Sequence, residues 1–276
     1  MHKRWLTALL TVWILAAAAG QALAKSSGSY TYDADGDAVP SRAGYIADTV
    51  KTAAQIDPSL GSFSAPQDLC VDETDGAVYI LDSGNNRVVV LTPELTLRRV
   101  IDRFVKADGT AVELQQPTGL YVREKTLYIA DPNGKQLLVC ADDGTVRQQI
   151  LRPDTNLLPA DVDFAPRKVL ADSEGNLYAS VTGVYQGALL FDAEGYFDGF
   201  FGSNEVEVTA ALLLDRFWKS LLTDTQAANI SRYVPEEFTS FDIDSRDFLY
   251  TVTQSDGVSD KIKKLNPTGS SVLPFA

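Results

Sequence analysis

The stretch from Pro66 to Pro93, PQDLCVDETDGAVYILDSGNNRVVVLTP, indicates how the chain folds. It contains three short apolar runs, which we expect to be strands, separated by turns at Asp75-Gly76 and at Ser83 to Asn86. Glycine and asparagine are favoured in such turns because they tolerate positive φ angles. Three later segments follow the same pattern, so one structural unit is expected four times.

The repeat is marked by proline and tyrosine. Pro66, Pro117 and Pro166 open three copies, and a fourth copy begins at Phe238. Repeats of about 40–50 residues with several short strands are typical of β-propeller blades. Because a blade is buried on both faces, its strands are nearly continuous apolar runs. An aliphatic residue precedes one tyrosine in the second strand of every copy, at Tyr79, Tyr128, Tyr178 and Tyr250. We therefore predict an all-β propeller with four blades.

Two of these strands carry a family resemblance. The segments VYILDSGNNR (78–87) and LYIADPNGKQ (127–136) resemble the NHL repeat, in which an aliphatic-tyrosine strand leads to aspartate, a Gly/Asn turn and arginine. The resemblance implies turn contacts between Asp82 and Arg87. The third and fourth copies depart from it, because we expect Ser180 and Thr253 at the position of the aspartate. The whole chain resembles exported NHL-repeat proteins of Gram-positive bacteria, sometimes labelled gluconolactonase-like.

Residues 1–24 are predicted to be a secretory signal peptide. Lys3 and Arg4 precede an apolar run from Trp5 to Ala19, and small residues at positions 22–24 suit cleavage. The alternative, a retained membrane anchor, needs about 20 apolar residues, which is more than this run has. We therefore expect a protein that is secreted and associated with the cell envelope.

Residues 25–61 are rich in serine, glycine and alanine and are predicted to be an N-terminal arm. Residues 62–276 contain the blades. Propellers usually close with more than four blades, so we expect these four to belong to a six-bladed or larger ring, of which the sequence is a part. A closed four-bladed ring and closure by dimerisation are the alternatives.

A helical insertion is predicted at residues 203–238. There the apolar residues, among them Leu214, Phe217 and Leu221, recur at steps of three and four, as on one face of a helix. A helical hairpin that caps one end of the propeller is one interpretation. The other is a docking surface for a partner, with Trp218, Lys219 and Arg232 as the partner-binding residues.

Composition excludes several functions. The only histidine, His2, lies in the predicted signal peptide, so the mature chain has no Ser-His-Asp triad and no histidine-bound zinc. The net charge of −13 argues against a nucleic-acid partner, because binding phosphates requires a basic face. Cys70 and Cys140 occupy different positions in their repeats, so we expect free thiols, with a disulfide as the alternative.

The candidate site lies where the innermost strands of the blades begin. These ends converge on the propeller axis, and we expect their side chains to line one funnel. Their amide, carboxylate, hydroxyl and cationic groups suit a polar or anionic small ligand better than a metal, although solvated strand ends would look the same. The predicted ligand-binding residues are Gln67, Asp68, Thr118, Arg167, Lys168 and Thr239.

The sequence favours a non-catalytic extracellular binding or scaffold module, with no catalytic residue, metal or cofactor. Its expected partner is a carbohydrate or other polar small molecule, or a membrane protein of the envelope. The alternative is a gluconolactonase-like hydrolase with calcium on the axis. Among the axial residues only Gln67 and Asp68 offer oxygen ligands, with Asp163 and Asp242 as further candidates, and Arg167 opposes a cation.

Overall fold

The structure is a computed structural model that describes residues 30–32, 35–40, 49–158, 162–202, 238–253 and 262–273. The predicted signal peptide and most of the predicted helical insertion, including Trp218, Lys219 and Arg232, lie outside these ranges. The chain divides into two units, Met1–Lys51 and Thr52–Ala276.

In the first unit, β1 (Tyr30–Tyr32) and β2 (Ala38–Pro40) form an antiparallel hairpin. The turn between them contains Gly36, whose φ of 86° suits glycine because it has no Cβ. This hairpin lies within the predicted N-terminal arm.

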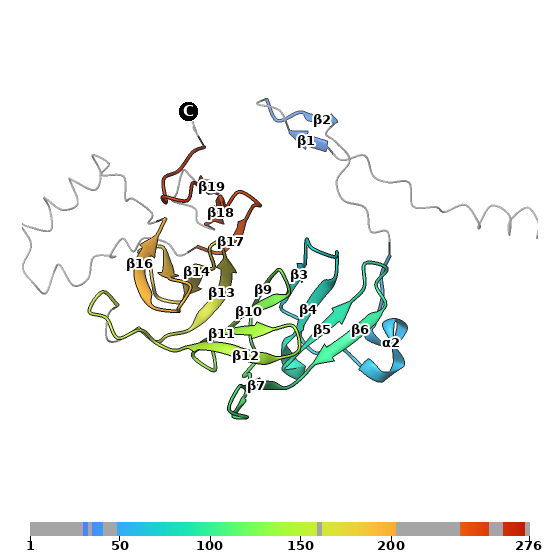
Figure 1. Cartoon of the computed structure of the whole chain (residues 1–276). Helices are drawn as coiled ribbons and strands as arrows, with labels where there is room; N and C mark the ends of the chain where they lie inside the picture. Colours follow the sequence, from blue (N-terminus) through green and yellow to red (C-terminus); the bar gives the residue numbers. More distant parts are fainter. Residues whose placement is uncertain are drawn as a thin grey trace, which may run out of the picture. The chain divides into compact units, whose positions relative to one another are not determined.

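The described residues of the second unit form the four predicted blades, as successive antiparallel sheets (Figure 1). Within each blade the strands follow one another in sequence order, beginning with the strand that opens the repeat. This arrangement confirms the prediction of an all-β propeller. Blade 1 contains β3 (Asp68–Val71), β4 (Val78–Asp82), β5 (Arg87–Leu91) and β6 (Leu97–Ile101). Blade 2 contains β9 (Gly119–Arg123), β10 (Thr126–Asp131), β11 (Gln136–Ala141) and β12 (Thr145–Ile150). Blade 3 contains β13 (Pro166–Ala171), β14 (Leu177–Val181), β15 (Ala188–Phe191) and β16 (Phe197–Phe201), and blade 4 contains β17 (Ser240–Ile243), β18 (Leu249–Val252) and β19 (Ile262–Leu265).

Blade 2 carries two additional strands that the repeat pattern did not predict. These are β7 (Phe104–Lys106) and β8 (Ala111–Val112), which form a hairpin in the connection from blade 1. β7 pairs with β12 in parallel, with Val105 opposite Thr145. This pairing covers the outer edge of β12, whose backbone groups would otherwise be open to another chain.

Two short helices precede blade 1. They are α2 (Ala53–Ile56), which begins with a capping box at Thr52, and the 3₁₀ helix η1 (Pro58–Leu60). Ala53 and Leu60 are buried against β5, so the last part of the predicted arm packs on blade 1. Within the described ranges, no helix is long and apolar enough to cross a membrane.

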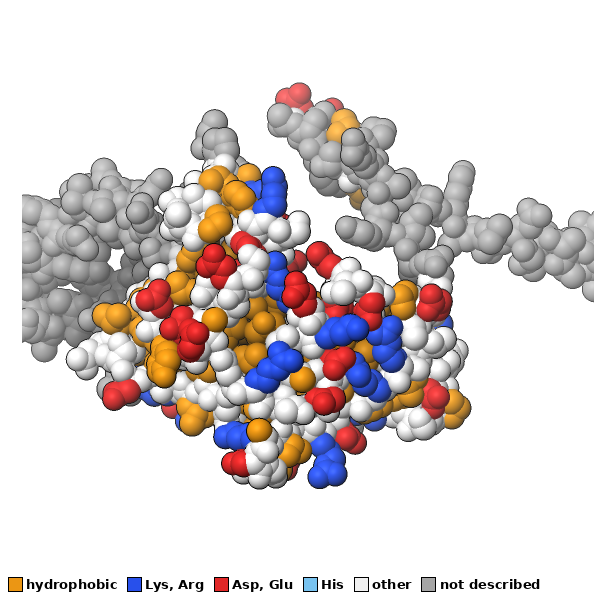
Figure 2. Space-filling model, in the orientation of Figure 1, with side chains coloured by type: hydrophobic (Ala, Val, Ile, Leu, Met, Phe, Trp, Pro, Cys, Tyr) orange, Lys and Arg blue, Asp and Glu red, His pale blue; other side chains and the backbone are white. Residues whose placement is uncertain are grey.

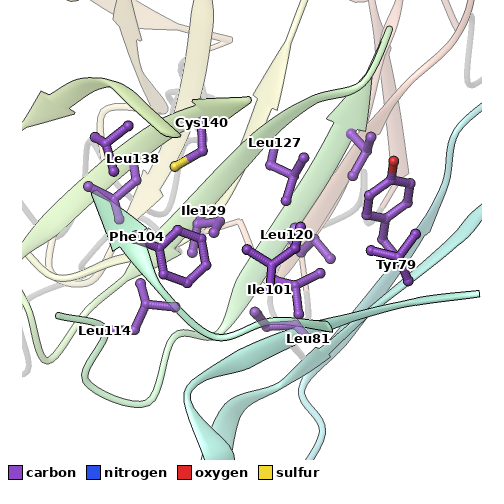
Figure 3. Close-up of a cluster of buried hydrophobic side chains, with 14 of the residues drawn as sticks. Tyr79, Leu81, Ile101, Phe104, Leu114, Leu120, Leu127, Ile129, Leu138 and Cys140 are labelled. Carbon is purple, nitrogen blue, oxygen red and sulfur yellow. The ribbon is translucent and has the colours of Figure 1, made fainter. Parts of the chain in front are cut away.

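The core consists of apolar layers between successive blades. Figure 3 shows the layer between blades 1 and 2, where Tyr79 and Leu81 of blade 1 meet Leu120, Leu127 and Ile129 of blade 2. Tyr79, Leu81 and Leu127 are at most 1% exposed. Burying such side chains removes about 25 cal/mol of unfavourable hydration per Å² of apolar surface, so each blade is stabilised by its neighbours.

The two cysteines are free thiols, as expected from the sequence. Cys140 is buried in the layer between blades 1 and 2, and Cys70 packs against the same layer. Burial raises the pKa of Cys70 to about 11 and that of Cys140 to about 12. Both therefore remain protonated and unreactive at neutral pH.

The face of blade 1 that points away from blade 2 is partly uncovered at β3. On β3, Leu69 is 63% exposed and Val71 is 47% exposed, whereas Leu120 and Val122, at the same positions of blade 2, are 5% and 4% exposed. In blade 2 these positions pack on the preceding blade. A ring of more than four blades stays a prediction, as do the alternatives of a closed four-bladed ring and closure by dimerisation.

Candidate functional site

A partly buried ion pair joins three blades near the propeller axis. Both carboxylate oxygens of Asp68 in β3 lie 3.0 Å from the Nζ of Lys168 in β13. The Asp68 carboxylate also accepts a hydrogen bond of 2.9 Å from the backbone N–H of Leu120 in β9. The two predicted ligand-binding residues Asp68 and Lys168 thus bind each other, and they hold the innermost strands of blades 1, 2 and 3 together.

Blades 2 and 3 approach closely beside this ion pair. The hydroxyl of Thr118 donates a hydrogen bond of 2.9 Å to the carbonyl oxygen of Arg167. A Cβ atom on Gly119 would lie 2.5 Å from that same oxygen and 2.8 Å from the Cα of Lys168. Gly119 is therefore required by the close contact of two backbones.

A pocket of about 460 Å³ opens at this end of the axis. Three of the predicted ligand-binding residues, Gln67, Thr118 and Arg167, line it together, one from each of blades 1, 2 and 3. We call it the Arg167 pocket. Its other lining residues are Ala65, Ser83, Gly84, Gln116, Pro132, Asn133, Ala165 and Thr182.

The Arg167 pocket differs in charge from the rest of the chain. Arg167 is its one charged residue among the described lining residues, although the chain as a whole carries a net charge of −13. Its guanidinium is oriented by a hydrogen bond of 2.7 Å from Nε to the hydroxyl of Thr182. On the face shown in Figure 2, acidic and basic side chains are interspersed, so the lack of carboxylates is a local feature of the pocket.

Asp82 holds one part of the pocket rim in place. Its fully buried carboxylate accepts hydrogen bonds of 2.7 Å from the Nε of Arg87 and 2.7 Å from the backbone N–H of Ser64. The amide of Asn85 donates a third, of 2.8 Å. The contact with Arg87 that the family resemblance implied is confirmed. The contact with Ser64 fixes the loop that places Ala65 in the pocket wall.

In blade 2, the carboxylate of Asp131 holds another part of the pocket rim in place. Its buried carboxylate accepts hydrogen bonds of 2.9 Å from the backbone N–H of Gln115 and 3.0 Å from the side-chain amide of Gln136. Gln136 thus replaces the arginine of the repeat. Because Gln115 precedes Gln116, this carboxylate fixes the second wall of the pocket.

The third copy of the repeat has no carboxylate at the position of Asp82. The residue at that position is Val181 and not Ser180, which was expected there from the sequence. Val181 lies three positions after Tyr178, as Asp82 lies three positions after Tyr79, so Ser180 was the wrong counterpart. Val181 is buried, as is Thr253 at the same position of the fourth copy.

Thr239, also predicted to bind ligand, is not among the residues that line the Arg167 pocket. Its backbone N–H donates a hydrogen bond of 2.8 Å to the carbonyl oxygen of Val252 within blade 4. The partner-binding residues Trp218, Lys219 and Arg232 lie outside the described residues, so their role stays a prediction.

Beside the apolar layer between blades 3 and 4, blade 4 makes polar contacts through Asp247, a residue that the sequence did not single out. The carboxylate of Asp247 accepts hydrogen bonds of 3.0 Å from Nη1 of Arg123 in blade 2 and 3.0 Å from the backbone N–H of Ser173 in blade 3. The hydroxyl of Ser173 donates to it as well. Partial burial opposes ionisation of Asp247, but the hydrogen bonds from Ser173 and Arg123 outweigh it and hold its pKa below the ordinary value of 3.8.

We expect Asp247→Asn to reduce the sensitivity of the protein to acid. A lowered pKa in the folded state stabilises the protein above the ordinary pKa, and this stabilisation disappears as the pH falls through the folded-state value. Thermal unfolding at pH 7 and at pH 3 measures the effect. The difference in Tm between the two pH values should be smaller for Asp247→Asn than for the unaltered chain, and an equal difference would contradict the assignment.

A second pocket, of about 290 Å³, lies between blades 1, 2 and 4. Its lining includes Asp72, Glu124 and Asp244, with Tyr121 and Arg123. Burial raises the pKa of Tyr121 to about 12, so its hydroxyl stays protonated. The Asp72 carboxylate accepts hydrogen bonds from backbone N–H groups of the turns around it, which is a structural role.

The residues proposed for an axial calcium ion do not form a set of ligands. The oxygens of Asp68 are bonded to Lys168 and Leu120, and Asp163 pairs with Lys135 at 2.9 Å. Among the residues that the structure describes, no group of three or more histidine, cysteine, aspartate or glutamate side chains could hold a metal ion.

Comparison with known families finds one match. Residues 63–91, which include the first three strands of blade 1, match the NHL repeat. No curated protein sequence matches the chain.

Several solved structures are similar in fold. Hydrazine synthase of Kuenenia stuttgartiensis is 13% identical with a TM-score of 0.47, and the match covers 83% of this chain and 52% of that one. Virginiamycin B lyase from Staphylococcus aureus is 13% identical with a TM-score of 0.41, over 87% of this chain and 60% of that one. The extracellular domain of a putative one-component system of B. thetaiotaomicron is 11% identical with a TM-score of 0.45, over 76% of this chain and 24% of that one. The chain thus spans about half the length of the first of these structures.

Proposed function

On the premise that this chain is a β-propeller that carries an NHL repeat, we propose that it is a non-catalytic binding module. Its ligand is a polar or anionic small molecule or glycan unit, bound in the Arg167 pocket. Gln67, Thr118 and Arg167 are the contact residues, and no cofactor takes part.

The charge of the pocket carries this proposal. Arg167 is the one charged residue in the described lining of the pocket, in a chain with a net charge of −13. A guanidinium presents two parallel N–H donors that match a carboxylate or a phosphate. The amide of Gln67 and the hydroxyl of Thr118 can bind the hydroxyl groups of the same ligand.

The surroundings of the pocket support binding because they are rigid before a ligand arrives. Asp82 and Asp131 hold two walls through backbone hydrogen bonds, and the ion pair of Asp68 and Lys168 holds the strands beside them. A preformed pocket avoids the entropy that would be lost by ordering its loops on binding.

The proposed location is outside the cell, at the envelope, and it rests on residues 1–24 of the sequence. The guanidinium of Arg167 suits the carboxylate of an acidic sugar. We therefore propose an acidic sugar unit of an envelope glycan as the ligand class, with an envelope membrane protein as the other kind of partner.

Titration calorimetry with glucuronate tests the proposal. We expect Arg167→Gln to weaken glucuronate binding by about tenfold or more, because a charged hydrogen-bond pair contributes about 1.5–3 kcal/mol. Arg98→Gln is the matched control, since Arg98 lies on the outer strand β6 and pairs with Asp75 at the surface. Equal binding by Arg167→Gln, or equal loss with Arg98→Gln, would sink the assignment.

Hydrolysis of glucono-δ-lactone, followed in the same samples with added calcium, separates binding from catalysis. We expect no turnover by the unaltered chain. Turnover that depends on calcium would replace the binding module with the lactonase.

A further inference from the structure

A third pocket lies at the rim of the propeller, away from the axis. It has a volume of about 720 Å³ and lies between β12 of blade 2, the β15–β16 hairpin of blade 3 and residues 151–155. We call it the Tyr196 groove. Its lining residues are Gln148, Gln149, Ile150, Leu151, Arg152, Pro153, Asp154, Thr155, Phe191, Glu194, Gly195, Tyr196 and Phe197.

The fold does not require a tyrosine side chain at position 196. Its backbone closes the turn between β15 and β16, where its carbonyl oxygen accepts a hydrogen bond of 2.9 Å from the N–H of Asp192. The same bond closes the turns of blades 1 and 4, where Thr96 and Ser270 accept it. A small hydroxyl residue is therefore sufficient for the turn, yet blade 3 has a tyrosine that is 73% exposed.

The groove has an apolar floor below this ring. Phe191 is fully buried, Ile150 is 8% exposed, and Phe197 packs against Phe191 with ring centroids 5.8 Å apart. At the rim, Leu151 is 56% exposed. Leu151 and the ring of Tyr196 therefore supply the exposed apolar surface of the groove, above a buried base of Phe191 and Ile150.

Planar polar groups surround the apolar floor in fixed orientations. The amide of Gln148 donates a hydrogen bond of 2.7 Å to the carbonyl oxygen of Ala193, and the amide of Gln149 donates one of 2.6 Å to the side-chain oxygen of Gln136. Because these bonds set the planes of both amides, the amides are preorganised for a ligand.

The charged residues of the groove do not favour a strongly charged ligand. Asp154 and Glu194 supply carboxylates and Arg152 supplies a guanidinium. The guanidinium of Arg152 donates to the carbonyl oxygens of Val162 and Leu158, which holds the loop that forms one wall.

We propose that the Tyr196 groove is a second binding site, for a neutral pyranose unit of a glycan. A pyranose has one face of C–H groups that can stack on an aromatic ring, and hydroxyl groups around its edge that bind amides and carboxylates. Sites for ligands of this size combine apolar surface with placed polar groups, and the lining of the groove contains both. A proline-rich peptide needs several exposed aromatic rings, whereas Tyr196 is the exposed ring among the described lining residues of this groove.

The Tyr196 groove and the Arg167 pocket share no lining residue, so each proposal can fail alone. A glycan with acidic and neutral units could occupy both, but the groove does not depend on that.

Saturation-transfer NMR and titration calorimetry test the groove with three neutral probes, cellotetraose, maltotetraose and N-acetylchitotetraose. We expect at least one probe to bind and Tyr196→Thr to weaken it by about tenfold or more, because the stacking surface is lost. Tyr196→Thr installs the kind of residue found at this turn in blade 1, so its Tm should stay close to that of the unaltered chain. Tyr196→Phe keeps the ring and should retain binding within about threefold.

Two control variants test whether the neutral probe binds in the groove and not elsewhere on the protein. Tyr185→Ala removes another exposed tyrosine, which does not line the groove, and Arg167→Gln alters the axial pocket; both should leave binding of the neutral probe unchanged. The proposal is overturned if no probe binds at millimolar concentration, or if Tyr196→Thr binds as the unaltered chain does. Loss of binding in Tyr185→Ala, or binding of a proline-rich peptide through Tyr196 in place of the glycans, would also overturn it.

Discussion

Replacement of Asp82 by alanine is expected to lower the free energy of unfolding by about 3–5 kcal/mol, because it leaves a buried charge without its partner. The Asp82 side chain is fully buried and the Arg87 side chain is 16% exposed. In the variant the guanidinium of Arg87 keeps its hydrogen bond to the carbonyl oxygen of Leu60 but loses its counter-charge. The backbone N–H of Ser64 loses its acceptor as well.

Asp75→Ala is the matched control for this prediction. Asp75 also pairs with an arginine at 2.7 Å, but its side chain is 28% exposed and that of Arg98 is 33% exposed. Exposed pairs contribute about 0–1 kcal/mol, so this variant should be nearly as stable as the unaltered chain. Urea unfolding, followed by circular dichroism, measures both. Equal losses in the two variants would show that burial of the Asp82 pair has no special effect.

The Asp82 variant also links stability to the proposed site. Because Asp82 holds the loop of Ser64 and Ala65, the folded fraction of the variant should bind glucuronate more weakly than the unaltered chain does. Measured below the unfolding temperature, unchanged affinity would mean that this loop does not form the binding wall.

Gly119→Ala is expected to destabilise the protein by about 3 kcal/mol, at the upper end of the cost of overpacking. The new Cβ would lie 2.5 Å from the carbonyl oxygen of Arg167 and 2.8 Å from the Cα of Lys168, and neither backbone atom can rotate away. Blades 2 and 3 would have to separate beside the Arg167 pocket. Thermal unfolding measures the loss.

A second substitution distinguishes backbone contact from side-chain contact at this position. The methyl group of Ala130 would lie 3.1 Å from the new Cβ, so Ala130→Gly removes that contact, together with the packing of this fully buried methyl group in the layer between blades 2 and 3. We expect the double variant Gly119→Ala, Ala130→Gly to be no more stable than Gly119→Ala alone. Recovery of stability in the double variant would show that the contact with Ala130 was the cause.

The propeller was predictable because its signals are local. The proline that opens each repeat, the tyrosine of the second strand and the glycine turns lie within one blade, and strand pairing inside a blade joins neighbouring segments. The pair of Asp82 and Arg87 was implied for the same reason, since the two residues lie on either side of one turn. The pairing of β7 with β12 was missed because it joins segments about 40 residues apart.

The candidate site was predictable in part. The starts of the innermost strands converge in any propeller, so Gln67, Thr118 and Arg167 could be expected to meet. Asp68 and Lys168 were placed beside them as ligand contacts, whereas in the structure they bind each other. A sequence shows that two residues carry opposite charges, but not that their side chains are close enough to pair.

The sequence alone determined the repeat, the strands of each blade and the strand ends that face the axis, because these depend on local periodicity and turn residues. Only the tertiary structure decided which side chains meet across blades. Lys168 reaches Asp68 across 100 positions of the chain, and Asp247 reaches Arg123 across 124. The Tyr196 groove likewise exists because blade stacking brings β12 beside the β15–β16 hairpin. Such contacts depend on the stacking geometry of blades, which no short stretch of sequence encodes.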